Sequence, residues 1–230
     1  MWPVTPTAGH LCWIKESSIW LDRHKTLVEA AQANKDADIV LLGDGIIQQL
    51  GSPLDKKPLC DAWQKQFQKF KTLNLGIGGE RTENLLWRLE HGALDGLAPK
   101  AIVLMIGVNN TRWMSCSAVP AESVAQGIKL CVDNIRARFP TSYVVLVKIL
   151  PATRGGEGIL ENIKKVNAPL EQMKLDKDPK VKVLDIWNDF TNQDGSLKND
   201  AYLYARLCLS DAGNQVFSAK LKTVMEQLIK

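Results

Sequence analysis

Five short apolar runs alternate with longer amphipathic segments along this chain, and that alternation constrains the fold more than any other feature. The runs cover residues 38–42, 72–75, 101–106, 143–150 and 181–186. Apolar residues recur at steps of three or four in residues 18–33, 82–89, 122–139, 159–173 and 211–229. Strands that alternate with helices pair in parallel, and right-handed crossovers place the helices on both faces. The sequence therefore predicts an α/β protein: a three-layer α/β/α sandwich around a central parallel sheet of about five strands.

Three local patterns refine this prediction. The helix over 159–173 contains Pro169, where we expect it to break and kink. Trp63, Phe67 and Phe70 stand at steps of three and four and predict a packed helical face. Arg88 and the neighbouring Glu90 are expected to form surface ion pairs rather than a site.

The composition excludes several classes of protein. Hydrophobic residues make up 45% of the 230 residues, which is enough for a sizeable core. No apolar run approaches the ~18 residues of a membrane span. The formal net charge is +4, with the basic residues scattered, which argues against nucleic acid as a partner. Neither a secretory signal nor a linker is visible, so we expect one domain over residues 1–230, with residues 1–17 as a loosely ordered N-terminal segment.

Neither the cysteine spacings nor any nucleotide-binding motif indicates a metal or a cofactor. The chain has five cysteines, at positions Cys12, Cys60, Cys116, Cys131 and Cys208. They form no C-x-x-C pair and are too sparse for a disulfide framework, so we expect reduced thiols and a cytoplasmic protein. No complete G-x-G-x-x-G and no G-x-x-x-x-G-K-[ST] motif is present.

Glycine-rich turns follow three successive predicted strands. The turns are G-D-G at 43–45, G-I-G-G at 76–79 and G-V-N-N at 107–110. Tight strand-to-helix connections explain any one of them, but ligands of open parallel sheets bind outside the carboxyl ends of the strands. Three such turns in succession therefore indicate a site. We expect the Asp44 carboxylate to bond to N–H groups of its own turn, and its use as a catalytic base is the less favoured alternative.

These blocks resemble the SGNH (GDSL-type) hydrolases, in which the first block reads G-D-S. Within that family, N-L-G-I-G-G-E-R-T at 74–82, L-W-R-L at 86–89 and G-V-N-N at 107–110 look like the catalytic (alpha) subunits of intracellular platelet-activating factor acetylhydrolase, type Ib. The resemblance runs from about residue 18 to the C-terminus. It implies the flavodoxin-like SGNH hydrolase fold and an acyl-transfer site built from the three turns.

The resemblance also implies that all three residues of the catalytic triad are missing. Gly45 stands where the family has its nucleophilic serine, Ala205 where it has the aspartate, and Cys208 where it has the histidine. Glycine has no nucleophile, alanine orients nothing, and a thiol is a poor proton shuttle near neutral pH. In subtilisin, removing the whole triad lowers kcat by roughly 2 × 10⁶-fold. We therefore expect a pseudoenzyme of a serine esterase family, without catalytic residues.

The oxyanion donors of the family survive as a vestigial oxyanion hole, formed by the Gly45 and Gly79 N–H groups and the Asn109 side chain. The three histidines, His10, His24 and His91, lie outside the family's base position. The sequence leaves open whether the pocket is empty or filled by Arg206 or Tyr204.

For partners, the resemblance implies a homodimer, or a heterodimer with a related alpha subunit, that associates with a WD40-repeat lissencephaly-type beta subunit. Two alternatives remain. One is a weak or altered acetyl or carboxyl esterase, of which Cys208 as nucleophile is the sharpest form. The other is a small acyl-ligand binder that uses the surviving oxyanion donors.

Overall fold

The computed structural model describes residues 2–7, 17–117, 119–154, 158–203 and 206–229. All five predicted strands are present and form one parallel sheet in the order β2-β1-β3-β4-β5. Their bounds are β1 Ile39–Gly43, β2 Thr72–Asn74, β3 Ala101–Met105, β4 Tyr143–Val147 and β5 Val181–Leu184. The strand order reverses between β1 and β3, and a crevice at the carboxyl ends of the strands is expected at such a switch point.

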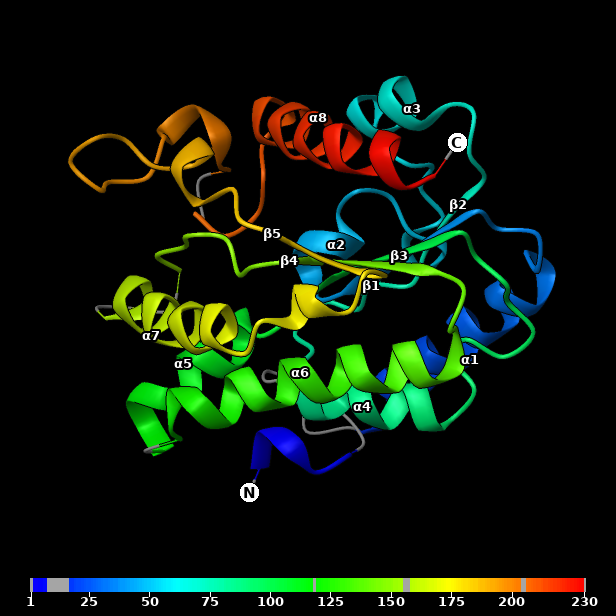
Figure 1. Ribbon diagram of the computed structural model, residues 1–230, viewed down its shortest axis with the longest axis horizontal. Coiled ribbons are helices and arrows are strands. Elements are labelled where there is room, and N and C mark those ends of the chain that lie inside the picture. Colours follow the sequence, from blue (N-terminus) through cyan, green and yellow to red (C-terminus); the bar gives the residue numbers. More distant parts are fainter. Residues whose placement is uncertain (1, 8–16, 118, 155–157, 204–205, 230) are drawn as a thin grey trace.

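Helices cover both faces of the sheet, which confirms the predicted α/β architecture (Figure 1). Helices α3 (Asp61–Phe67) and α8 (Asp211–Leu228) lie on one face. The other face is covered by α4 (Thr82–Glu90), α6 (Ala121–Arg138) and α7 (Ile159–Gln172). Helix α1 (Ser17–Ala33) packs beside α4, with the Trp20 and Trp87 ring centroids 5.3 Å apart.

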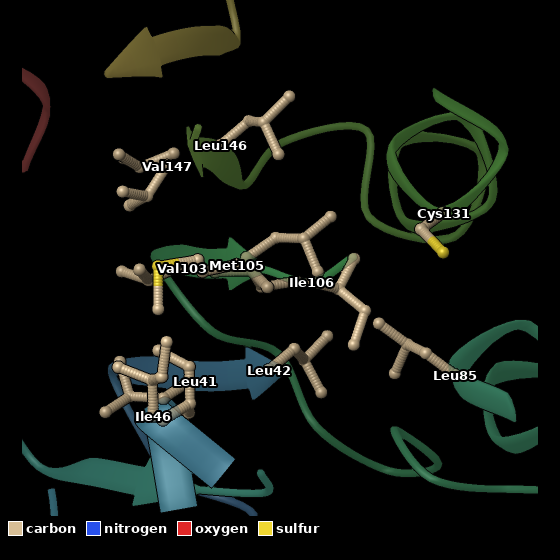
Figure 2. Close-up of a cluster of buried hydrophobic side chains, with 14 of the residues drawn as sticks. Leu41, Leu42, Ile46, Leu85, Val103, Met105, Ile106, Cys131, Leu146 and Val147 are labelled. Carbon is tan, nitrogen blue, oxygen red and sulfur yellow. The ribbon is translucent and has the colours of Figure 1, made fainter. Parts of the chain in front are cut away.

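The core consists of two apolar layers, one on each face of the sheet. Leu42 and Ile106 lie on the side that faces Leu85 of α4 and Cys131 of α6, whereas Leu41 lies on the opposite side (Figure 2). Consecutive strand residues point to opposite faces, so a strand that is covered on both faces must be apolar throughout. Every residue of β1 and β3 is buried accordingly.

Two short helices in the connections were not expected as elements. Helix α2 (Gly45–Gln48) follows β1 directly, and α5 (Val108–Ser117) follows β3. Little apolar periodicity marks α5, and a tertiary contact supports its start: Asn110 accepts a hydrogen bond from the Thr82 N–H, 3.1 Å away. The α3 segment contains the stacked Trp63 and Phe67 rings, 4.2 Å apart, as the spacing predicted.

Helix α7 does not end at Pro169, so the predicted break is wrong, whereas the predicted kink stays a prediction. The helix continues to Gln172, and the Met173 N–H still bonds to the Pro169 carbonyl. Proline removes one helical hydrogen bond. The flanking Val166 and Leu170 are buried, and their packing offsets that loss.

At the N-terminus, residues 2–7 lie against α4: the Thr7 N–H bonds to the Glu83 carbonyl, and the Thr82 hydroxyl donates to the Pro3 carbonyl. The rest of the expected N-terminal segment falls mostly on residues 8–16, which lie outside the described residues. Within the described residues, no helix has the length and apolar character needed to cross a membrane.

Candidate functional site

A cavity of about 350 Å³ lies where the turns after β1, β2 and β3 meet. Four of the predicted site residues line it: Gly45, Gly79, Asn109 and Cys208. The first three come from the three glycine-rich turns, and Cys208 comes from the segment before α8. The fold thus brings together residues that are up to 163 positions apart, because the carboxyl ends of parallel strands meet at one edge of the sheet. Ala205 lies outside the described residues.

Glycine at position 45 is not required by the backbone. Gly45 is the first residue of α2, and a Cβ built on it would approach the Gly78 Cα at 3.4 Å, an ordinary contact distance. Gly43, two residues earlier, is different: its Cβ would lie 2.1 Å from the Met105 backbone oxygen of β3. The chain therefore has room for a side chain at the position that the resemblance assigns to the family's nucleophile.

Gly45 and Gly79 line this cavity from two of the turns, and each carries a backbone N–H group. Gly45 stands at the start of a helix, where an N–H has no intrahelical partner, and Gly79 has a φ of +86°. Within the described part of the chain, no other group bonds to either N–H. Asn109 Nδ2 donates to the Glu80 carbonyl at 2.8 Å, which leaves one of its two hydrogens for a ligand.

Asp44, which separates β1 from α2, lines the cavity and is 1% exposed. Its Oδ1 accepts a hydrogen bond from the Ile46 N–H at 3.0 Å, as the turn pattern predicted. Burial raises the pKa of Asp44 from its ordinary value of 3.8 to about 7, although the Ile46 hydrogen bond favours the charged form. Near neutral pH, the carboxyl group at the cavity wall is therefore partly protonated.

Cys208 is half-buried, and its sulfur accepts a hydrogen bond from Gln49 Nε2 at 2.8 Å. Neither described histidine lines the cavity. His24 packs between Trp20 and Trp87, and burial lowers its pKa to about 4. His91 is exposed at the end of α4, where Nδ1 contacts the Trp87 carbonyl, and His10 lies outside the described residues. The cavity thus offers no imidazole from the described chain.

A buried ion pair supports the turn that carries Gly79. Arg88 Nε lies 3.0 Å from Glu80 Oε1, and both side chains are fully buried. Trp20 Nε1 donates to the same carboxylate oxygen, and Arg88 Nη2 donates to the Leu75 carbonyl. Burial raises the pKa of Glu80, whereas the guanidinium of Arg88 opposes this shift. The prediction of a surface ion pair for Arg88 is therefore wrong, because its partner is the buried Glu80, whose backbone carbonyl accepts the hydrogen bond from Asn109.

Several polar residues that sequence reasoning did not single out also line the cavity. They are Arg23, Gln48, Gln49, Arg112 and Arg154. Arg112 stands three residues after Asn109, so recognition of α5 would have placed both on one helical face. Nothing in the sequence marks Arg23 or Arg154. Arg206 lines a different cavity, beside Leu197 and Tyr202, and so does not fill this one. Tyr204 lies outside the described residues.

A larger hollow of about 620 Å³ lies beyond the carboxyl ends of β4 and β5. Its most buried cation is Lys148, which is 6% exposed and contacts both Glu171 and Asp185. Because these opposite charges satisfy one another, the 350 Å³ cavity at the β1–β3 switch point remains the better candidate for ligand chemistry.

The family model described as "GDSL-like Lipase/Acylhydrolase family" matches residues 41–216. The chain therefore belongs to this family of acylhydrolases, and the resemblance inferred from the motifs is confirmed. Solved structures of similar fold include a putative platelet activating factor from Streptococcus pneumonia (TM-score 0.68, 21% identity, 90% of this chain and 95% of that one). A GDSL-like lipase from Bacteroides thetaiotaomicron is also similar (TM-score 0.70, 18% identity, 90% and 98%).

Among curated relatives, the chain is similar to platelet-activating factor acetylhydrolase IB subunits. The human subunit alpha1 is 32% identical over 189 residues, which cover 82% of this chain and 75% of the relative. The subunit beta homolog of Drosophila melanogaster is 30% identical over 211 residues, which cover 91% and 86%.

Proposed function

We propose that this protein is a catalytically inactive homologue of the platelet-activating factor acetylhydrolase Ib alpha subunits and that it acts as a dimeric interaction subunit. The observation that carries the proposal is the composition of the cavity. Gly45 and Cys208 line it at the positions that the resemblance assigns to the serine and the histidine. Ala205 stands at the position of the aspartate.

The chemistry of acyl transfer supports inactivity. A serine esterase needs a nucleophile, a base that accepts its proton and a group that orients the base. Gly45 supplies no nucleophile, and the cavity has no imidazole from the described residues. The surviving N–H donors stabilise an oxyanion, but oxyanion stabilisation and binding alone leave only about 10³–10⁴-fold acceleration over water.

A paired hydrolysis assay tests this part of the proposal. The native protein and a variant carrying Gly45→Ser, Ala205→Asp and Cys208→His are each incubated with a short-chain acetyl ester. We expect no turnover by the native protein and measurable turnover by the restored one. The matched control carries Ala205→Asp and Cys208→His but keeps Gly45, so it lacks the nucleophile and is expected to stay silent. Turnover by the native protein at enzymatic rates would refute the proposed inactivity.

The interaction role rests on the family rather than on the cavity. We propose a homodimer, or a heterodimer with a related alpha subunit, that binds a WD40-repeat regulatory subunit in the cytoplasm. Light scattering of the purified protein, alone and with that subunit, measures both associations. A dimer that forms a stoichiometric complex is the expected result. A strict monomer that ignores the WD40 subunit would contradict the interaction role and leave the question of catalysis untouched.

A further inference from the structure

The hollow of about 620 Å³ beyond the carboxyl ends of β4 and β5 has a polar floor that the fold holds in place. Lys148 follows β4 and is 6% exposed, and its Nζ donates to Asp185 Oδ2 at 2.5 Å and to Glu171. Asn167 of α7 bonds to both backbone groups of Ile149: its Oδ1 accepts from the N–H at 3.1 Å, and its Nδ2 donates to the carbonyl at 2.8 Å. Because these contacts fix the chain beside Lys148, the floor needs little rearrangement to receive a ligand.

The same network places an aromatic side chain in the wall of the hollow. Asp185 Oδ1 accepts a hydrogen bond from the Trp187 N–H at 2.9 Å, so the carboxylate that contacts Lys148 also fixes the turn that carries the indole. The Trp187 side chain is half-buried, and Asn188 beside it is exposed. Among the described residues, neither the indole N–H nor the Asn188 carboxamide bonds to another group of the protein. An aromatic surface and two polar groups are therefore available to a ligand.

The ion pairs of the hollow favour a neutral ligand. Each charged side chain that the structure describes in the lining already has an opposite charge nearby: Lys148 contacts Glu171 and Asp185, Lys164 lies 3.8 Å from Glu161, and Asp189 lies 2.7 Å from Lys220. A charged ligand would have to compete with one of these pairs. The lining residues other than Ala168 and Trp187 are polar, so a purely apolar ligand would leave their hydrogen-bonding groups without partners.

From this arrangement we infer that the hollow binds a saccharide, with Trp187 as its stacking surface and Asn188 and Glu171 as its hydrogen-bond partners. A sugar ring is neutral, its hydroxyl groups both donate and accept, and its C–H face packs against an aromatic ring. A nucleobase also stacks, but its polar groups lie in one plane, whereas those of the hollow come from α7, from the ends of β4 and β5 and from the 3₁₀ helix Trp187–Asp189. A volume of about 620 Å³ lies within the range of small-molecule sites.

This site is separate from the 350 Å³ cavity at the ends of β1, β2 and β3. The two linings share no residue among those that the structure describes. The inference therefore goes beyond the proposed function, and saccharide binding does not depend on whether the protein hydrolyses esters.

Calorimetric titration of the full chain with glucose, galactose, mannose, N-acetylglucosamine, maltose and cellobiose tests the inference. We expect at least one of these saccharides to bind with a Kd below about 1 mM. Trp187→Ala should weaken that binding about tenfold, because it removes the stacking surface, and Asn188→Ala should weaken it about fivefold, because it removes a hydrogen-bonding side chain. The matched control is Asn199→Ala, at an exposed asparagine of another cavity, which should leave the Kd within about twofold.

A thermal unfolding curve for each variant shows that it is folded. If Trp187→Ala does not fold, Asn188→Ala, at an exposed side chain, gives the same readout. Ethylammonium, acetate and adenosine serve as probes of the other ligand classes. Saccharide binding that depends on Trp187 and Asn188 supports the inference. Three results would overturn it: no binding of any of the six saccharides at 10 mM (about tenfold above the expected limit), saccharide binding that the two variants leave unchanged, or tighter binding of one of the other probes that Trp187→Ala or Asn188→Ala weakens.

Discussion

Replacing Asp44 by asparagine should make the protein more stable, and more so at higher pH. The folded protein keeps a proton on Asp44 up to a pKa of about 7, whereas an ordinary aspartate releases it at 3.8. Between these values the folded state binds more protons than the unfolded state, so the free energy of unfolding falls as pH rises. The shift in the pKa of Asp44 therefore lowers the free energy of unfolding by about 4 kcal/mol above pH 7 and by about 2 kcal/mol at pH 5.

Asparagine removes this penalty while it preserves the local structure. Its side-chain oxygen accepts the hydrogen bond from the Ile46 N–H, and asparagine is as good an N-cap as aspartate. Urea unfolding at pH 5 and pH 8, followed by circular dichroism, gives the stability difference between wild type and variant at each pH. We expect that difference to grow by about 2 kcal/mol between the two pH values.

Asp194 provides the matched control. It also accepts a hydrogen bond from a backbone N–H two residues further on, that of Ser196 at 2.9 Å, but it is exposed. Hydrogen bonds from Ser196 lower the pKa of Asp194, so its contribution has the opposite sign: stability is gained as pH rises and lost as pH falls. Asp194→Asn should therefore bring no stabilisation at pH 8. Equal stability changes for Asp44→Asn at both pH values would refute the reasoning, since Asp44 would then titrate as an ordinary carboxylate.

Four further substitutions test the packing around the site, each by urea denaturation. Gly45→Ala should change the free energy of unfolding by less than about 1 kcal/mol. Gly43→Ala should lower it by about 3 kcal/mol or prevent folding, because the alanine Cβ would lie 2.1 Å from a backbone oxygen of β3. Equal effects of the two substitutions would contradict the different surroundings of the two glycines. Arg88→Met should destabilise the protein by about 3–5 kcal/mol, because it leaves the buried Glu80 carboxylate without its partner, and a loss below about 1 kcal/mol would mean that the pair is dispensable. Leu42→Ala, at a side chain with no exposed surface, should lower the free energy of unfolding by about 2–5 kcal/mol. A smaller loss would show that neighbouring core side chains fill the space that the leucine leaves.

Sequence reasoning performed best where a local pattern has one physical solution. The continuous apolar runs of β1 and β3 are typical of strands covered on both faces, and all five strands lie within three residues of the predicted bounds. The glycine-rich turns predicted where the candidate cavity lies, because chain topology places the ends of parallel strands together. The resemblance assigns Gly45 to the position of the family's serine, and that prediction rests on residue identity alone.

Sequence reasoning failed where a property depends on residues that are distant in the chain. Arg88 was expected on the surface because nothing near it in sequence requires burial, yet it pairs with Glu80 inside the protein. Helix α5 lacks strong periodicity, and its start is supported by the contact of Asn110 with Thr82. Pro169 does not end α7, because its apolar neighbours are buried against the rest of the protein.

The sequence by itself thus determined the α/β class and predicted where the candidate cavity would form, because both follow from residue type and local spacing. Only the tertiary structure decided the electrostatics of the cavity. Three arginines from three elements line it, and burial raises the pKa of Asp44 to about 7. Charge density and desolvation depend on which groups meet in space and how much water they lose, and the order of residues along the chain specifies neither of them directly.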